Sequence, residues 1–183
     1  MKKIYKERWI SGYPETLCGA GSTIKSCEPI IKTLPIIIKE FKIKSILDLG
    51  CGDLNWIKHV REIEKVKYLG IDTHIHLESI HTTNDFKLIE GNILYMEIPK
   101  SDLVICKDVM IHMENFQIKS LLESIKQSKS KYILLTNYSI NNNKRSLKNY
   151  APLNIELPPF SLKNYIMSIT LEGNKSLTLF ENE

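Results

Sequence analysis

Hydrophobic residues in the first quarter of the chain follow a helical spacing that then gives way to the pattern of a strand. Between residues 22 and 41 apolar positions recur every three or four residues, which predicts a helix with a serine or threonine N-cap. Pro29 and Pro35 fall inside this stretch and predict a kink or a helix in two pieces. Residues 45–49 then form a short apolar run that ends in glycines, which is typical of a buried strand entering a turn.

Strand and helix patterns alternate further along the chain. Helical spacing predicts helices over 53–63, over 74–82 and from an N-cap at Asn115, the last with inward-facing Phe116, Leu121, Leu122 and Ile125. Short apolar runs predict strands over 66–71, 86–89, 103–106 and 132–136. This alternation predicts an α/β fold with a mostly parallel sheet and helices on both of its faces.

The end of the chain has a different pattern. Three prolines between residues 139 and 165 exclude a long regular element there. The β-rich runs 165–171 and 176–181 flank Gly173-Asn174 and predict a hairpin. Without a repeat or a second domain boundary, we expect one domain over 1–183. Its parts are an N-terminal segment (1–21), a cap helix region (22–41) and a core (42–183).

Composition narrows the possible partners and compartment. A net charge of +4 is too small to predict a nucleic-acid partner, which usually requires a focused basic patch. The apolar runs are too short to span a membrane, and no signal peptide is visible. The four cysteines lack zinc-site spacing and predict reduced thiols in the cytoplasm. The sequence predicts no oligomeric state.

The turn from Asp48 to Asp53 is the first candidate for chemistry. Gly50 and Gly52 follow a predicted strand, where glycine lets backbone N–H groups face a ligand without a Cβ in the way. Asp72 ends the next predicted strand, where a carboxylate can accept hydrogen bonds from two ribose hydroxyls. A structural turn and a helix cap are the alternatives for the two features, but together they favour a nucleoside-containing cofactor.

The turn also separates two classes of cofactor. Dinucleotide-binding turns carry a third glycine in G-x-G-x-x-G, and this chain has Asn55 at that position. Asp53 in the turn would repel a pyrophosphate, whereas it suits a cofactor that carries an ammonium and a sulfonium. The comparison favours S-adenosylmethionine.

Several segments resemble motifs of class I, Rossmann-like methyltransferases that use S-adenosylmethionine. The segments ILDLGCGDLNW, YLGID, LIEGNI and LVICKDVMIHM resemble the first four motifs of that class, in the right order. GAGST, CGDLNW, DVMIHM, SKYILLTNY and PLNIELPPF resemble a family of small members of the class. The resemblance covers nearly the whole chain from Gly19 onward. It implies a seven-stranded sheet in the order 3-2-1-4-5-7-6 with an antiparallel last strand.

The resemblance also implies roles for individual residues. Asp48, Gly50 and Gly52 match positions that line the methionine end of the cofactor, which becomes S-adenosylhomocysteine after transfer. Asp72, with Thr73 beside it, matches the ribose-binding acid.

Other matching positions lie near the adenine of the cofactor or near the acceptor. Asn92 and Ile93 match the loop that reads the adenine, although many class I enzymes have an acid where Asn92 stands. Lys107 and Asp108 follow the fourth strand, where the transferred methyl normally faces the acceptor. Leu54 departs from the class, because many members have a third glycine there.

Further residues have two interpretations each. His112 lies four residues after Asp108, so both can share one pocket if the segment is helical, with His112 as the base and Asp108 orienting it or contacting the acceptor. A structural histidine is the alternative. Trp56 either covers the cofactor or packs in the core. Ser22 and Thr23 either close over the carboxylate end of the cofactor or cap the helix.

The reaction predicted is O-methylation of a small-molecule or sugar-like hydroxyl, as in a glycan. The sequence after the fourth strand lacks the D/N-P-P-Y/F segment used for nucleobase amines and the Pro-Cys nucleophile used at base carbon. Asn137 and Tyr138 stand where the lysine-rich tetrad of RNA ribose methyltransferases would continue. Nucleic-acid acceptors are therefore disfavoured. RNA or protein methylation and a non-catalytic cofactor-binding subunit stay open as alternatives.

No metal is predicted. Asp53 and Asp108 offer two carboxylates without a third matched ligand. His74, His76 and His81 give no single ligand face on a short polar helix and are interpreted as surface residues.

Overall fold

The computed structural model describes residues 13–75, 83, 85–144 and 150–182, and these residues form one seven-stranded sheet. The strand order is β3-β2-β1-β4-β5-β7-β6. Strands β1 to β5 pair in parallel, and β7 runs antiparallel to both of its neighbours. This arrangement confirms the predicted fold class and strand order. The strands are β1 (Ser45–Leu49), β2 (Lys67–Asp72), β3 (Phe86–Glu90), β4 (Leu103–Cys106), β5 (Tyr132–Tyr138), β6 (Tyr165–Thr170) and β7 (Lys175–Glu181).

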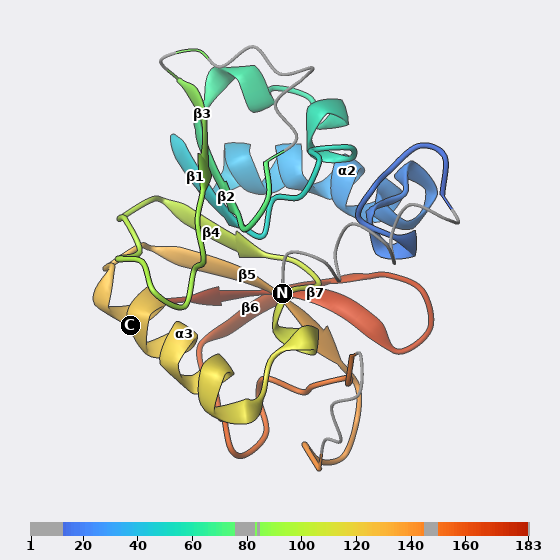
Figure 1. The fold of residues 1–183 in the computed structure, drawn as a ribbon, viewed down its shortest axis with the longest axis vertical. Coiled ribbons are helices and arrows are strands. Elements are labelled where there is room, and N and C mark those ends of the chain that lie inside the picture. The colour runs from blue at the N-terminus through green and yellow to red at the C-terminus, as the bar shows by residue number, and fades with distance from the viewer. Residues whose placement is uncertain (1–12, 76–82, 84, 145–149, 183) are drawn as a thin grey trace.

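Among the described residues, two α-helices cover opposite faces of this sheet (Figure 1). They are α2 (Ile24–Glu40) and α3 (Asn115–Gln127). The short 3-10 turns in the described connections are η1 (Ala20–Ser22), η2 (Ile57–His59), η3 (Ile63–Lys65) and η5 (Met110–His112).

The core is divided into two layers by the alternation of side chains along the strands. Ile46 and Ile105 belong to the cluster that packs against α2, whereas Leu47 and Val104 belong to the cluster around α3. Because successive residues of a strand point to opposite faces, a continuous apolar strand supplies both layers.

Helix α2 is one continuous helix of 17 residues, so the prediction of two pieces is wrong. Its N-cap is Thr23, whose side chain accepts a hydrogen bond from the backbone N–H of Ser26. Pro29 and Pro35 each remove one backbone donor, but the apolar face between and beyond them is buried against the sheet. Burial of that face compensates for the missing hydrogen bonds and keeps the helix whole.

The helix predicted over 53–63 is wrong, because the chain there forms only the short turns η2 and η3. Leu54 has a φ of 60° and Glu62 a φ of 70°, both in the left-handed region. A right-handed helix cannot pass through a left-handed residue. The apolar spacing of this stretch therefore reflects burial of one side of the chain and does not indicate a helix.

Helix α3 is present, although two details of its prediction are wrong. Its N-cap is Glu114, one residue before the predicted Asn115. Phe116 is 72% exposed, because the buried stripe of the helix runs through Leu121 and Ile125 at a spacing that leaves position 116 outside it. The exposed ring lies at the start of the helix that follows the β4 connection.

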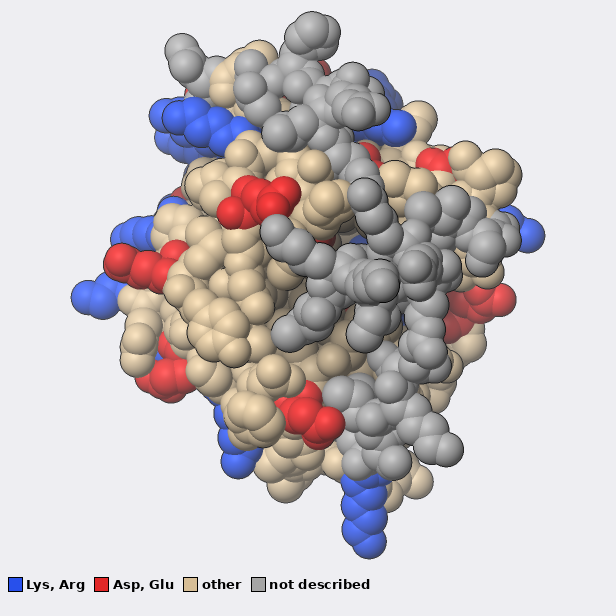
Figure 2. All heavy atoms as spheres, viewed as in Figure 1, with Lys and Arg blue, Asp and Glu red and all other residues tan. Residues whose placement is uncertain are grey.

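The predicted hairpin is confirmed as β6 and β7, with Gly173 in the left-handed region at its turn. Residues 76–82 of the helix predicted over 74–82 lie outside the described residues. In the described part of the chain, no helix combines the length and apolar character that a membrane crossing requires. On the face seen in Figure 2, the described basic and acidic side chains are interspersed.

Candidate functional site

The candidate site lies where the parallel strands end, and its first part is the turn after β1. Gly50 and Gly52 have φ values of 81° and 61°, which glycine adopts readily. A Cβ on Gly50 would collide with Val109, and a Cβ on Gly52 would lie 2.5 Å from the sulfur of Cys18. Both glycines are therefore required by backbone conformation and by the close approach of neighbouring segments.

Asp72 lies directly beside this turn. Its carboxylate accepts a 2.8 Å hydrogen bond from the backbone N–H of Gly52, 20 residues earlier in the chain. It also accepts from the Thr73 hydroxyl at 3.3 Å and from the backbone N–H of His74 at 3.2 Å. The acid at the end of β2 and the glycine turn at the end of β1 thus form one continuous site.

Asp48 stands below the turn and is 2% exposed. Its carboxylate accepts a 2.7 Å hydrogen bond from the hydroxyl of Tyr68 on β2. Burial raises the pKa of Asp48 from 3.8 to about 7, although the Tyr68 hydrogen bond and the Lys107 charge act in the opposite direction. Asp48 is therefore a buried acid under the turn, not an acid on its surface.

Asp53 fastens the N-terminal segment to the turn. One carboxylate oxygen accepts hydrogen bonds from the Thr16 hydroxyl at 2.9 Å and the Leu17 backbone N–H at 2.7 Å. Nearby, the side-chain amide of Asn55 donates to the carbonyl of Ser22 at 3.1 Å. These contacts hold the described residues 13–23 beside the glycine turn.

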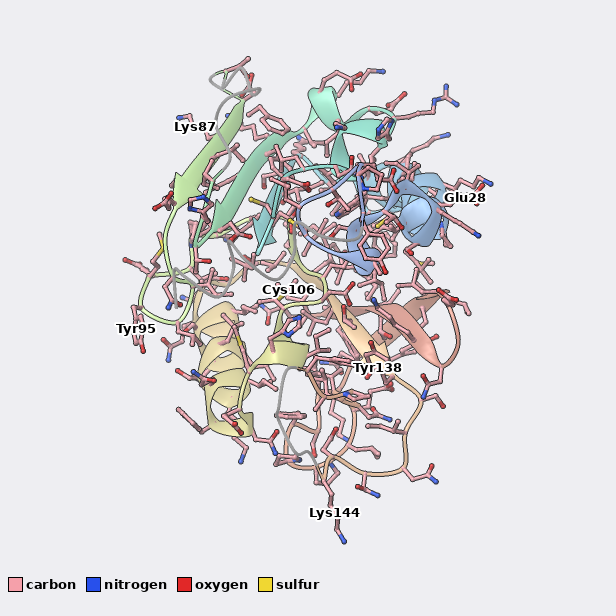
Figure 3. The ribbon with its side chains drawn as sticks, turned by 45° about the vertical axis from the view of Figure 1, so that its right-hand side comes forward. Glu28, Lys87, Tyr95, Cys106, Tyr138 and Lys144 are labelled. Carbon is pink, nitrogen blue, oxygen red and sulfur yellow. The ribbon has the colours of Figure 1, made fainter. Side chains whose placement is uncertain are left out.

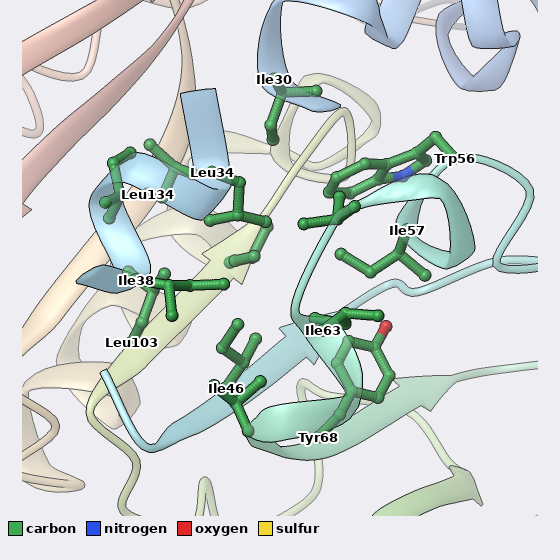
Figure 4. Packing of buried hydrophobic residues seen from close by; sticks show 14 of the residues in the cluster. Ile30, Leu34, Ile38, Ile46, Trp56, Ile57, Ile63, Tyr68, Leu103 and Leu134 are labelled. Atoms are coloured by element: carbon green, nitrogen blue, oxygen red, sulfur yellow. The ribbon is translucent and has the colours of Figure 1, made fainter. Parts of the chain in front are cut away.

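Trp56 and Ile93 lie inside the core. Trp56 is 4% exposed and packs in the α2-side cluster, near Ile30 and Ile57 (Figure 4). Ile93 is also buried, in the cluster on the opposite face. The burial of Trp56 fits its packing alternative, and both side chains lie in the hydrophobic core.

The loop after β3 begins with a compact turn. The side-chain oxygen of Asn92 accepts a 3.0 Å hydrogen bond from the backbone N–H of Leu94, and its own carbonyl accepts from that of Tyr95. Tyr95 is strongly exposed and lies far from Tyr138 in Figure 3. The loops after β3 and β5 thus lie toward opposite ends of the candidate site.

A charged cluster follows β4. Lys107 donates to the Asp108 carboxylate at 2.8 Å and to the carbonyl of Gly21. Lys175, the first residue of β7, reaches the same carboxylate at 2.6 Å. Thr136 on β5 donates to it at 3.2 Å. The three-charge cluster Lys107–Asp108–Lys175 therefore joins the N-terminal segment, the β4 connection and the last strand.

Burial and neighbouring charges set the pKa directions in this cluster. Burial alone would raise the pKa of Asp108, but Lys107 and Lys175 hold it below its usual value. Burial would lower the pKa of Lys107, yet Asp108 raises it above normal. For Lys175, burial and the like charge of Lys107 lower the pKa despite the opposing effect of Asp108.

His112 ends η5, a 3-10 turn, so the segment from Asp108 to His112 is not the helical turn on which their predicted pairing rests. The Asp108 carboxylate accepts hydrogen bonds from the two lysines and from Thr136. The backbone N–H of Ala151 donates to the carbonyl of Ile111, which places the segment from residue 150 onward beside η5.

Lys175 and Thr136 are site residues that the sequence analysis missed. Lys175 pairs in register with Tyr138, the last residue of β5, so it lies where the parallel strands end. Because β7 is antiparallel, its first residue reaches the edge that the parallel strands reach with their last. A search for polar residues after each strand overlooks such a position.

Among the described residues, no group of three or more His, Cys, Asp or Glu side chains is placed to hold a metal ion. His74 lies 4.0 Å from Glu90 and is exposed. His76 and His81 lie outside the described residues.

Solved structures resemble this arrangement. Human N-acetylserotonin methyltransferase in complex with SAM superposes with a TM-score of 0.60 and 13% identity, covering 98% of this chain and 65% of that one. The methyltransferase domain of bacterial CtHen1-CN gives 0.63 and 11%, covering 85% and 99%. Magnesium protoporphyrin IX methyltransferase from Synechocystis, solved with bound SAM, gives 0.59 and 10%, covering 100% and 92%. The chain has the fold of class I methyltransferases.

The likeness is one of structure. No protein-family model matches the sequence, and no curated protein matches it. The chain spans about two thirds of the human N-acetylserotonin enzyme that it resembles, the 65% given above. Its class I methyltransferase fold places the glycine turn and Asp72 at the edge where ligands bind in open α/β sheets.

Proposed function

We propose that the protein is an S-adenosylmethionine-dependent methyltransferase. The observation that carries the proposal is the 2.8 Å hydrogen bond between the Asp72 carboxylate and the Gly52 N–H. This hydrogen bond joins the proposed ribose-binding acid and the glycine turn into one site. The class I fold and two neighbours that were solved with SAM support the same cofactor.

The acids of the site support a cofactor with positive charge. Asp48 lies under the turn and Asp72 beside it, while Asp53 holds the N-terminal segment against it. An ammonium and a sulfonium near these carboxylates would be attracted to them, most strongly where water is excluded. We propose that Asp48, Gly50, Gly52 and Asp72 hold this cofactor, with Thr73, Asn92 and Lys107 at its margins.

Other residues bound the pocket. We propose that Ser22 and Thr23, with Asp53, close the N-terminal segment over the methionine end, and that Trp56 and Ile93 support the pocket by packing beneath it. The hydrogen bond from Asn55 to the Ser22 carbonyl supports this placement. The segment then excludes water from the donor side.

The bound cofactor supplies an electrophilic methyl group. The chain has to align the acceptor and remove its proton, and alignment can contribute roughly 7–11 kcal/mol in well-oriented systems. We propose His112, which is half-buried at the end of η5, as the group that takes the proton. Asp108 acts through the charged cluster, where it holds Lys175 at the acceptor side.

We propose O-methylation of a small-molecule or glycan hydroxyl. N-acetylserotonin and magnesium protoporphyrin IX appear in the names of two structural neighbours, and both are small molecules. The interspersed charges of Figure 2 support this over a nucleic acid, which would favour a basic stripe. Four free cysteines support a reducing, cytoplasmic location.

Cofactor binding is tested with Asp72→Ala. We expect the affinity for S-adenosylhomocysteine, measured by calorimetry, to fall roughly 10- to 100-fold, because charge-assisted hydrogen bonds to the ribose are lost. Asp85→Ala removes an exposed carboxylate before β3 and serves as the control. Unchanged affinity in Asp72→Ala would show that the cofactor pocket is wrongly placed.

Methyl transfer is tested with labelled S-adenosylmethionine and a panel of glycans, phenols, RNA and peptides. Label in the glycan or phenol fraction supports the proposal, and label only in RNA or peptide supports the alternatives. His112→Ala should lower the rate by ~10²–10⁴-fold with cofactor affinity unchanged. Tight cofactor binding without transfer to any acceptor would favour a non-catalytic binding subunit.

A further inference from the structure

The charged cluster Lys107–Asp108–Lys175 carries two positive charges and one negative charge in a largely buried place. The side chain of Lys107 is 4% exposed and that of Asp108 is 16% exposed. Buried charge is costly unless it is paired and hydrogen-bonded. The cluster therefore has a positive charge in excess of what its own carboxylate neutralises.

The two lysines differ in the number of N–H donors that remain available to a ligand. Lys107 donates to the Gly21 carbonyl and to Asp108, and it is almost fully enclosed. The side chain of Lys175 is 17% exposed, and the one described hydrogen-bond partner of its ammonium is the Asp108 carboxylate. An ammonium has three N–H donors, so Lys175 keeps donors for a ligand on its exposed side.

Lys175 also lies at the edge of the sheet where the parallel strands end. It is in register with Tyr138 at the end of β5, and it shares Asp108 with Lys107, the first residue after β4 (Figure 3 labels Cys106 and Tyr138, the last residues of β4 and β5). The carboxylate fixes the position of the ammonium from the buried side. The exposed side of the ammonium then faces solvent next to the proposed acceptor pocket.

We propose that Lys175 binds the reacting oxygen of the acceptor as an oxyanion, so that the preferred acceptors carry an acidic O–H, such as a phenol or enol. This inference rests on the methyltransferase function proposed above and narrows its acceptor class. The acceptor O–H gives its proton to His112, which passes it to water. An electron pair of the oxyanion forms the new O–C bond to the methyl group, while sulfur keeps the pair of the S–C bond that breaks.

The surroundings of Lys175 favour such an anion. Among the described residues, the titratable groups that face it are Cys27 on α2, Lys107 and Asp108 after β4, and Tyr138 on β5. Burial and Lys107 both disfavour its charge, so a second anion beside it would relieve an unfavourable electrostatic situation. Burial also raises the pKa of Tyr138 to about 12, which keeps that phenol neutral. Tyr138 therefore does not compete with the acceptor as the anion beside Lys175.

The test uses 4-nitrophenol, whose phenolate absorbs visible light, with the protein saturated in S-adenosylhomocysteine. We expect the wild-type protein to lower the apparent pKa of the bound probe, and Lys175→Met to abolish this effect. Lys175→Arg keeps a positive charge and should retain part of it. Lys87→Met removes an exposed lysine at the start of β3 and should behave like the wild type.

Catalysis gives a second readout. With a phenol that the wild type methylates, Lys175→Met should lower kcat about 10²–10³-fold, as for loss of one oxyanion donor, while the affinity for S-adenosylhomocysteine is unchanged. A wild type that leaves the probe's apparent pKa unchanged overturns the inference, and so does a Lys175→Met variant that matches the wild type. If the probe is ionised but no acceptor is methylated, the proposed function fails while the anion site stands.

Discussion

The two halves of the site differ in charge and in the way they are built. The donor half, comprising Asp48–Asp53 and Asp72, contains acids that are bound by backbone N–H groups and hydroxyls. The acceptor half, comprising Lys107, Asp108, Thr136 and Lys175, contains one acid enclosed by two ammonium groups. The donor half is assembled from consecutive strands, whereas the acceptor half joins residues after β4 to residues of β5 and of the last strand.

The difference indicates how one sheet edge can receive two reactants of opposite charge. Under the proposed function, a cationic methyl donor is drawn to the acidic half and an oxyanion acceptor to the basic half. The halves touch at Gly50, whose missing side chain leaves room for Val109 after β4. Changes at this contact should therefore affect both halves, and changes within one half should leave the other intact.

The largest effect is expected for Gly50→Ala. The new methyl group collides with Val109, and the backbone keeps a left-handed φ of 81°. Overpacking and left-handed strain together cost about 3 kcal/mol or more. We expect a clear fall in the midpoint of thermal unfolding and loss of S-adenosylhomocysteine binding.

Gly173→Ala is the matched control for this change. Its φ is 66°, but a Cβ there meets nothing within 4 Å. The cost should be limited to the left-handed backbone, about 1–2 kcal/mol. Equal destabilisation in the two variants would show that the contact with Val109 is unimportant.

Asp48→Asn tests the buried acid of the donor half through its pH dependence. Burial raises the pKa of Asp48 from 3.8 in the unfolded chain to about 7, so the folded state holds a proton that the unfolded state has lost between these values. The stabilisation is therefore full below pH 4 and is lost as the pH rises through about 7, by up to about 4 kcal/mol.

The amide of Asp48→Asn does not titrate. We expect the variant to lose less stability than the wild type between pH 5 and 8 in chemical denaturation. Parallel pH profiles for the two proteins would contradict the assignment of a raised pKa to this carboxyl.

The smallest effect is expected for Thr16→Val, which keeps the shape of the side chain and removes the donor to Asp53. Loss of one charge-assisted hydrogen bond at 2.9 Å should cost about 1–2 kcal/mol. Affinity for S-adenosylhomocysteine should fall while the anion effect at Lys175 is preserved. Thr170→Val, at an exposed position on β6, is the control. A weakened anion effect in Thr16→Val would mean that the halves are more strongly coupled than their contacts indicate.

Much of the fold could be predicted, because buried strands impose their pattern directly. The runs at β1, β4 and β5 are apolar since both faces are covered, and glycines mark the end of β1. The stretch 53–63 could not be predicted, because the left-handed backbone of Leu54 leaves no trace in the apolar spacing. Leu54 stands where many class I members have glycine, and it adopts a conformation that glycine favours.

The positions of Gly50, Gly52 and Asp72 at the ends of consecutive strands could likewise be predicted, whereas their role in cofactor binding stays a prediction. The pairing of Asp108 with Lys175 could not be predicted, because 67 residues separate them. The predicted partnership of Asp108 and His112 relied on local helical spacing, and the backbone at Asp108 is left-handed with a φ of 58°. Long-range contacts of this kind depend on the sheet order, which single-residue patterns do not encode.

The contacts of the charged cluster with the N-terminal segment and with the last strand have a consequence for folding kinetics. The contacts from Lys107 to Gly21 and from Lys175 to Asp108 close loops of 86 and 67 residues. Such distant contacts form after the local ones, since the entropy of loop closure has to be overcome first. The donor half, made from neighbouring strands, can thus order before the acceptor half, so a refolding chain would gain its methyl-donor pocket before its acceptor pocket.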